Sequence, residues 1–197
     1  MGPMGFRNTY FALRHGESRP NVRGLILSGL RDGKKWRNTL TKNGRDQVAA
    51  SVREARDAGM LDGTAVIYSS PFSRCVRTAK IARTILGVRE RIVFDDRLRE
   101  RWFGDWEGTS NANYPKVWEG DALDPRHKTA NVESAAEVRD RVRGLIEDLE
   151  GRYEGRSILL VSHGDILQIT QAFFEQRSPA EHRMLAPLRV AEVRRIN

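Results

Sequence analysis

Four short polar groups carry most of the residue types that could do chemistry, and each comes after an apolar or β-branched run. They are residues 14–17 (RHGE), 70–74 (SPFSR), 99–100 (RE) and 162–164 (SHG). Open α/β sheets bind ligands beyond the carboxyl ends of their strands. We therefore interpret the four groups as parts of a single site.

The residue types in these groups suit the binding and transfer of a phosphoryl group. A phosphate ester carries nearly two negative charges, and the planar guanidinium groups of Arg14 and Arg74 would hold its oxygens in bidentate fashion. A neutral imidazole is a nucleophile and a protonated one is a donor, which gives His15 and His163 two different uses. Glu100 would protonate the leaving oxygen.

Each residue also has an ordinary structural interpretation when it is taken alone. A single histidine after a strand is more often a packing residue, and a single arginine or glutamate in a loop is usually just solvated. The repetition of the pattern after four separate runs favours the functional interpretation. Asn21 could be a further phosphate donor, whereas His127 and His182 follow no strand and are predicted to be surface residues. No residues have convincing metal-ligand spacing, so we expect neither a metal nor a cofactor.

The elements needed to position these residues are those of an α/β protein. The run 158–161 (ILLV) is unbroken and apolar, as in a central parallel strand that is covered on both faces. Strands are also predicted at 9–13, 65–68, 91–94 and, as a half-exposed edge, 191–196, and helices from Thr41 to about Gly59, after Pro71, over 134–149 and after Gly164. Ser134 and Glu137 form a capping box at the start of the third helix. The expected fold is a three-layer α/β/α arrangement around a mostly parallel sheet.

Two segments lack a clear period. Residues 22–40 form a long loop, which could act as a lid, with the basic cluster Lys34, Lys35 and Arg37. These cations could attract an anionic substrate, although a solvated charge run is the more common outcome. Residues 102–131 contain several aromatic residues, and we expect this irregular stretch to pack over the sheet and shape a pocket.

The composition places few further demands on the fold. A chain of 197 residues with 39% hydrophobic residues suits one domain, which we expect over residues 6–197 after a disordered lead-in at 1–5. The single cysteine, Cys75, excludes an intramolecular disulfide and is expected in the core. No apolar run approaches the roughly 18 residues needed to span a bilayer. We expect a soluble, cytoplasmic protein that has no membrane association.

The formal net charge of +8 favours anionic partners of some kind. Arginines are spread along nearly every predicted helix, and no basic cluster with aromatic platforms points to nucleic acid. A small phosphorylated substrate is therefore the expected partner, and the sequence does not specify an oligomeric state.

Taken together, these motifs resemble the histidine phosphatase superfamily, also called phosphoglycerate-mutase-like. The matching segments cover nearly all of the chain: 13–17 with Asn21, 40–41 with Gly44, 68–71 with Arg74 and 78–79, 98–100 with Gly104 and 106–108, 133–134, and 161–164. The resemblance implies that His15 attacks phosphorus while Arg14, Arg74 and His163 hold the phosphoryl oxygens. It also implies that Glu100 protonates the departing alcohol, that Gly164 lies at the phosphate, and that water then releases the phosphate without a metal.

Within that family the chain is more similar to the phosphatases than to the mutases. Mutases that resemble the glycolytic enzyme are longer and usually carry Arg-His-Tyr-Gly after the acid, where this chain reads RWFGDWEG over 101–108. Phosphotransfer of the mutase type and a non-catalytic phospholigand-binding module are the alternatives. Asp165, the pair 131–132 and the long basic loop depart from the family pattern, and these departures bear on substrate preference.

Overall fold

A five-stranded sheet forms the centre of the computed structural model, which describes residues 5–197. The strands are β1 (Thr9–Arg14), β2 (Val66–Ser69), β3 (Val93–Phe94), β4 (Ser157–Ser162) and β5 (Val193–Arg195), in the order β3-β2-β4-β1-β5. The first four strands run parallel, and β5 pairs antiparallel with β1 at the edge. The predicted mostly parallel sheet with an edge strand at the C-terminal end is confirmed. Of the predicted lead-in, residues 1–4 lie outside the described part of the chain.

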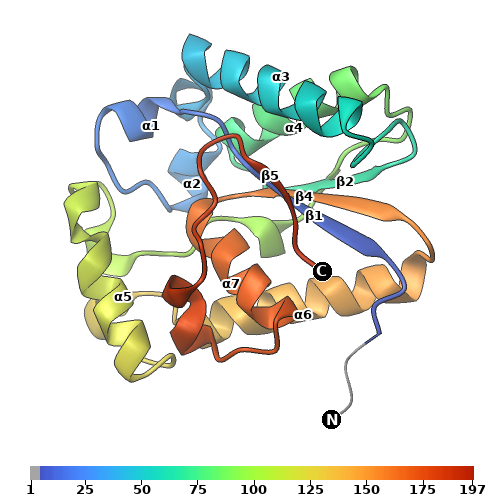
Figure 1. The fold of residues 1–197 in the computed structure, drawn as a ribbon. Helices are drawn as coiled ribbons and strands as arrows, with labels where there is room; N and C mark the ends of the chain where they lie inside the picture. Colours follow the sequence, from blue (N-terminus) through green and yellow to red (C-terminus); the bar gives the residue numbers. More distant parts are fainter. Residues whose placement is uncertain (1–4) are drawn as a thin grey trace.

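Helices cover both faces of this sheet (Figure 1). The helices α3 (Lys42–Asp57) and α4 (Ser73–Leu86) lie on one face, and α6 (Ala135–Arg152) and α7 (Gly164–Phe174) lie on the other. Thr41 caps α3 by accepting a hydrogen bond from the backbone N–H of Gly44, and α6 opens with the expected capping box. The three-layer arrangement predicted from the sequence is therefore present.

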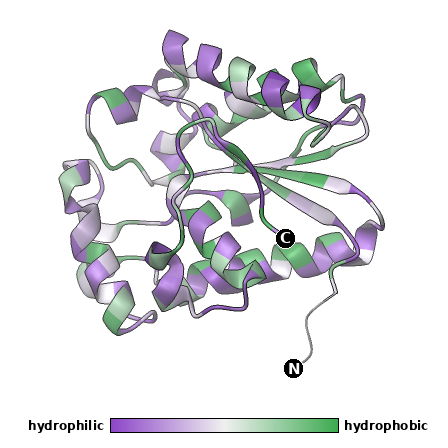
Figure 2. Ribbon diagram, in the orientation of Figure 1, coloured by the Kyte–Doolittle hydropathy of each residue, from purple (hydrophilic) through white to green (hydrophobic). Residues whose placement is uncertain are grey.

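Successive side chains of the central strands point to opposite faces of the sheet, so the core has two layers. Tyr10 and Ala12 face α6 and α7, whereas Phe11 and Leu13 face α3 and α4. Figure 2 shows hydrophobic residues on the strands and hydrophilic residues on the outward surfaces of the helices. Cys75 is buried in the second layer, as predicted, and burial raises the pKa of its thiol to about 12, so it stays protonated.

Two segments differ from the sequence prediction. The third strand contains only two residues because the chain leaves the sheet at Asp95, whose carboxylate accepts the backbone N–H of Arg97 and starts a 3₁₀ turn, η2 (Asp96–Leu98). The stretch 102–131 is not irregular throughout. It includes α5 (Tyr114–Leu123) and the 3₁₀ turns η3 (Gly104–Trp106), η4 (Asn111–Asn113) and η5 (Thr129–Asn131).

The loop 22–40 contains only short helical turns. These are α2 (Leu30–Gly33) and η1 (Trp36–Asn38), preceded by α1 (Arg19–Val22). Together with α5 they lie beyond the carboxyl ends of the parallel strands (Figure 1). A final 3₁₀ segment, η6 (Pro179–Met184), connects α7 to the last strand and packs against α5. Among the helices described between residues 5 and 197, none is both long and apolar enough to cross a membrane.

Candidate active site

Two histidines meet where the central strands end. His15 follows β1 and His163 follows β4, and these neighbouring strands are in a register that places Arg14 opposite Ser162. The centroids of the two imidazole rings are 5.2 Å apart, and both side chains are almost completely buried. The structure therefore brings these two groups together at one edge of the sheet.

Hydrogen bonds fix which nitrogen of His15 carries the proton. Its Nδ1 lies 2.8 Å from the carbonyl oxygen of Gly16, so Nδ1 carries the proton and donates it. The Nε2 atom then accepts a hydrogen bond of 3.1 Å from Nε of Arg74. Burial, together with the charges of Arg74 and Arg14, lowers the pKa of His15 well below its ordinary value. The ring is a neutral imidazole whose unprotonated nitrogen is Nε2.

Close backbone contact fixes the loop that carries this histidine. A Cβ atom on Gly16 would lie 2.2 Å from the carbonyl oxygen of Gly44, and one on Gly44 would lie 2.0 Å from that of Glu17. Both distances are too short for any side chain. The start of α3 can therefore pack directly against the loop only because both positions are glycine.

The two arginines leave donors available to an anion. The Nε of Arg74 is shared between His15 and Nδ1 of His163, 3.2 Å away, and its Nη2 donates to the carbonyl oxygen of Leu27. Its buried Nη1 and the buried Nε of Arg14 find no acceptor within residues 5–197. Buried guanidinium N–H groups are costly to leave unpaired, so this pair is well suited to bind an anion.

His163 begins the helix α7. Its Nε2 lies 2.9 Å from Oγ of Ser70, and burial lowers its pKa well below the ordinary value. The next residue, Gly164, packs so closely on Arg14 that a Cβ atom would lie 3.2 Å from the guanidinium carbon. The N-terminus of this 11-residue helix thus lies beside the arginine, and its partial positive charge adds to an anion-binding environment.

Glu100 is the acidic residue closest to this group. It follows η2 and not the strand itself, which corrects the prediction that it lies directly at a strand end. Its Oε2 is 3.6 Å from Nδ1 of His163 and 3.9 Å from Nη2 of Arg74. Burial raises the pKa of Glu100 to about 7 even though Arg74 opposes the shift. The carboxyl group can therefore exchange a proton near neutral pH.

Two other carboxylates are held away from this role. Glu17 accepts hydrogen bonds from Thr41 and Asn43, and Glu107 accepts them from Ser28 and from the backbone N–H of Gly29. Neither lines the cavity.

A cavity of about 260 Å³ opens over the histidines and arginines. Arg14, His15, Asn21, Arg74, Glu100 and Gly164 all line it, so every predicted site residue except the fully buried His163 contacts this space. The Oδ1 of Asn21 already accepts from the backbone N–H and Oγ of Ser18. The stretch 102–131, which was expected to shape the pocket, contributes Asn111, Tyr114 and Trp118 to its wall. Sequence reasoning missed the wall residues Gln168 and Arg183.

The basic cluster of the 22–40 loop does not take part in this cavity. Lys35 and Arg37 pair with Asp32, and Lys34 lies 3.8 Å from Asp96. The structure therefore favours a solvated charged surface over direct substrate contact.

Comparison with known proteins identifies the family. A family description, "Histidine phosphatase superfamily (branch 1)", matches residues 10–197. The chain belongs to this superfamily. We therefore interpret the histidines and arginines at the strand ends by comparison with other members of this superfamily.

Named relatives include both phosphatases and a mutase. A protein named as a phosphatase in Schizosaccharomyces pombe is 32% identical over 81% of this chain, and the chain spans only 54% of its length. One named as a phosphoserine phosphatase in Hydrogenobacter thermophilus is 31% identical over 80% of the chain and 73% of the relative. An Escherichia coli protein named as a phosphoglycerate mutase is 30% identical over 78% of the chain and 68% of the relative.

A solved structure supports the same fold. The mycobacterial glucosyl-3-phosphoglycerate phosphatase, determined with a vanadate, superimposes with a TM-score of 0.76 at 25% identity. The match covers 94% of this chain and 90% of the mycobacterial one.

Behind the cavity, this member of the superfamily holds a buried charged network that the sequence analysis missed. Arg101 is fully buried and binds Asp121 through two hydrogen bonds of 2.6 and 2.7 Å, and it reaches Asp165 at 3.2 Å. His127 lies 3.0 Å from Asp121, and His182 lies 3.7 Å from Asp165. The prediction that both histidines are surface residues is wrong, because two buried carboxylates draw them inward. His182 is fully buried, and only 11% of the His127 side chain is exposed.

Replacing Arg101 with methionine should destabilise the fold by about 3 to 5 kcal/mol, since Asp121 and Asp165 would then be buried without their principal partner. Denaturant unfolding measures this loss. Arg177→Met is the matched control, because Arg177 pairs with Glu175 at the surface and should cost less than about 1 kcal/mol. Equal losses in the two variants would contradict a structural role for the network.

No three of the histidine, cysteine, aspartate and glutamate side chains within residues 5–197 are grouped so that they could hold a metal ion.

Proposed function

We propose that this protein is a phosphomonoesterase that works through a phosphohistidine at His15, with residues 6–197 acting as one catalytic domain. The observation that carries the proposal is the neutral His15 Nε2 lying beside two arginines with unpartnered buried donors. The site thus places a nucleophile directly beside an anion-binding group. Family membership supports the same reaction class.

In the first step, Nε2 of His15 attacks phosphorus and the bond from phosphorus to the ester oxygen breaks. Arg14, Arg74 and His163 hold the three peripheral oxygens as their negative charge shifts. Glu100, protonated at neutral pH or below, gives its proton to the departing alcohol.

In the second step, the Glu100 carboxylate takes a proton from a water molecule, whose oxygen attacks phosphorus. The bond between phosphorus and nitrogen breaks and its electron pair returns to His15, which regenerates the neutral imidazole. Phosphate leaves, and Glu100 is protonated again for the next cycle.

Phosphotransfer of the mutase type remains the second candidate, because relatives from Escherichia coli carry a mutase name. A mutase has to shield its phosphoenzyme from water and pass the group to a second substrate hydroxyl. The short segment after Glu100 favours hydrolysis.

The direct test is release of phosphate from a generic aryl phosphate. Arg14 and Arg74 supply the positive charge that a metal would otherwise give, so turnover should persist within about twofold after exhaustive dialysis against a chelator. Loss of activity that a divalent ion restores would contradict the metal-free mechanism. Absence of turnover with any ester, despite tight phosphate binding, would instead favour a non-catalytic phospholigand module.

A further inference from the structure

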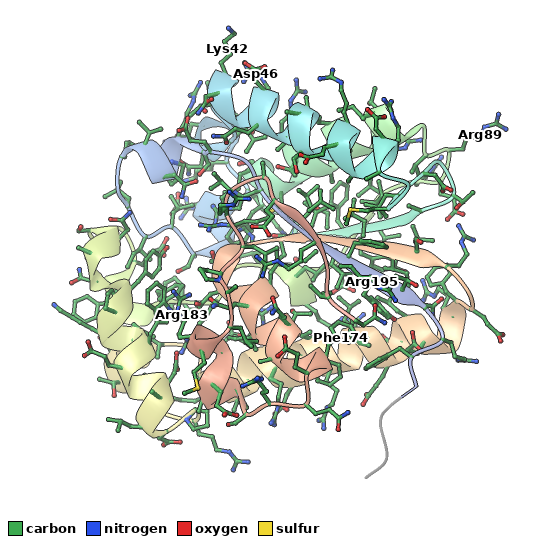
Figure 3. All side chains as sticks on the ribbon, in the orientation of Figure 1. Lys42, Asp46, Arg89, Phe174, Arg183 and Arg195 are labelled. Carbon is green, nitrogen blue, oxygen red and sulfur yellow. The ribbon has the colours of Figure 1, made fainter. Side chains whose placement is uncertain are left out.

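Arg183 lines the same cavity but has no role in the mechanism above. It belongs to η6, far along the chain from the strand-end groups, and Figure 3 shows it between η6 and α5. It therefore reaches the cavity from a segment outside the sheet. A cation there is not needed to bind the phosphoryl group itself.

The side chain of Arg183 is held in place from two sides. Its guanidinium carbon lies 3.7 Å from the centroid of the Trp118 ring, and its Nη1 donates to Oε1 of Gln168. Gln168 is fully buried and donates from Nε2 to the carbonyl oxygen of Leu185, which fixes the orientation of its amide. This support preorganises the arginine before any ligand arrives.

The platform under Arg183 is itself anchored. Trp118 donates from its indole N–H to Oδ1 of Asp165, at 2.9 Å, and stacks on Tyr114 with an interplanar angle of 9°. Phe103 packs edge-to-face against Tyr114, and their ring centroids are 4.8 Å apart. Asp165 thus positions the platform that carries the arginine.

Arg183 has no carboxylate partner of its own. Within residues 5–197 no acidic oxygen comes within ion-pair distance of its guanidinium, whereas Asp165 already binds Arg101, Trp118 and His182. Most of the guanidinium N–H donors are therefore available to a ligand. A planar guanidinium group with free N–H donors can bind a carboxylate or a phosphate in bidentate fashion.

We propose that Arg183 binds a carboxylate on the substrate, so that the preferred substrates are phosphate monoesters of hydroxy acids. A carboxylate is favoured over a second phosphate because only one arginine is present at this wall and the negative Asp165 lies close behind it. This proposal rests on the proposed function, because it takes the substrate group bound by Arg14 and Arg74 to be the phosphoryl group.

The test compares ligands that differ only in the carboxylate. We would measure the affinity of ω-phosphonocarboxylates with two to five carbons, which cannot be hydrolysed, against alkyl phosphonates of equal length. At one or two lengths the carboxylate should improve binding about 10- to 100-fold, as expected for a charge-assisted pair. In Arg183→Gln, the ratio of the two affinities, with and without the carboxylate, should fall to within about twofold of one. Arg183→Lys should retain part of the preference for the carboxylate.

Arg189→Gln removes a cation of the neighbouring C-terminal segment, 89% of whose side chain is exposed, and should leave the ratio unchanged. A wild-type ratio near one at every length, or an unchanged ratio in Arg183→Gln, would overturn the assignment. Hydrolysis of simple alkyl phosphates is measured in parallel. If those are hydrolysed and no carboxylate preference exists, only the Arg183 inference fails, whereas a preference without any hydrolysis overturns the proposed function alone.

Discussion

Replacing His15 with alanine should abolish both turnover and covalent labelling, lowering kcat by about 10⁴- to 10⁶-fold as in other enzymes that lose their nucleophile. Wild-type protein quenched during turnover of a phosphoryl-labelled aryl phosphate should carry the label on histidine. A phosphorus–nitrogen bond to imidazole is labile in acid and survives alkali, which is the reverse of phosphoserine. The chemistry of release therefore identifies the acceptor.

Two serines near the site make this typing informative. Ser70 already bonds to His163, and the buried Oγ of Ser73 has no partner within the described residues. Label that survives acid would assign the nucleophile to one of them and would be incompatible with the proposed mechanism. His127→Gln is the matched control, since His127 lies outside the cavity and its loss should leave labelling intact.

Glu100→Gln should separate two classes of substrate. With an aryl phosphate, whose leaving group departs without a proton, the first step should survive while attack by water slows by about 10²- to 10⁴-fold. The variant should then show a burst of the aryl alcohol and accumulate phosphoenzyme. With an alkyl phosphate both steps need Glu100, so turnover should fall without a burst. Equal losses on both substrates, with no phosphoenzyme, would mean that Glu100 serves binding or folding.

The pH dependence gives an independent check on Glu100. Its raised pKa of about 7 means that the free enzyme loses the donated proton above neutrality, so kcat/KM on alkyl phosphates should fall about tenfold per pH unit above pH 7. The pKa of His15 is lowered, so His15 stays neutral and adds no acidic limb near pH 6.5. An acidic limb near pH 6 would belong to the phosphate ester itself. Glu100→Gln should lose only the alkaline limb.

The sequence predicted best those parts of the molecule whose position follows from strand pairing. Apolar runs identify strands, and parallel strands end at one edge, so His15 and His163 could be placed together without any structure. Arg74 followed from the helix that begins just after its strand.

The later wall could not be predicted in that way. The helix α5 has Pro115 in its first turn and Gly120 in its interior, and its only buried residues are Val117 and Asp121. No apolar stripe therefore signals it. His182 and Arg183 take their positions from η6 folding back against α5, which is a tertiary contact with no local pattern.

The division of labour between sheet and wall has a consequence for how such a protein can change. The two histidines are spaced by hydrogen-bonded neighbouring strands, whereas the residues opposite them come from α5 and η6, two segments outside the sheet. Libraries randomised only at the cavity-lining positions of those two segments, Tyr114, Trp118 and Arg183, should therefore yield new substrate selectivities while the chemical step is inherited unchanged. In this architecture, the reaction and the choice of substrate can therefore change independently of each other.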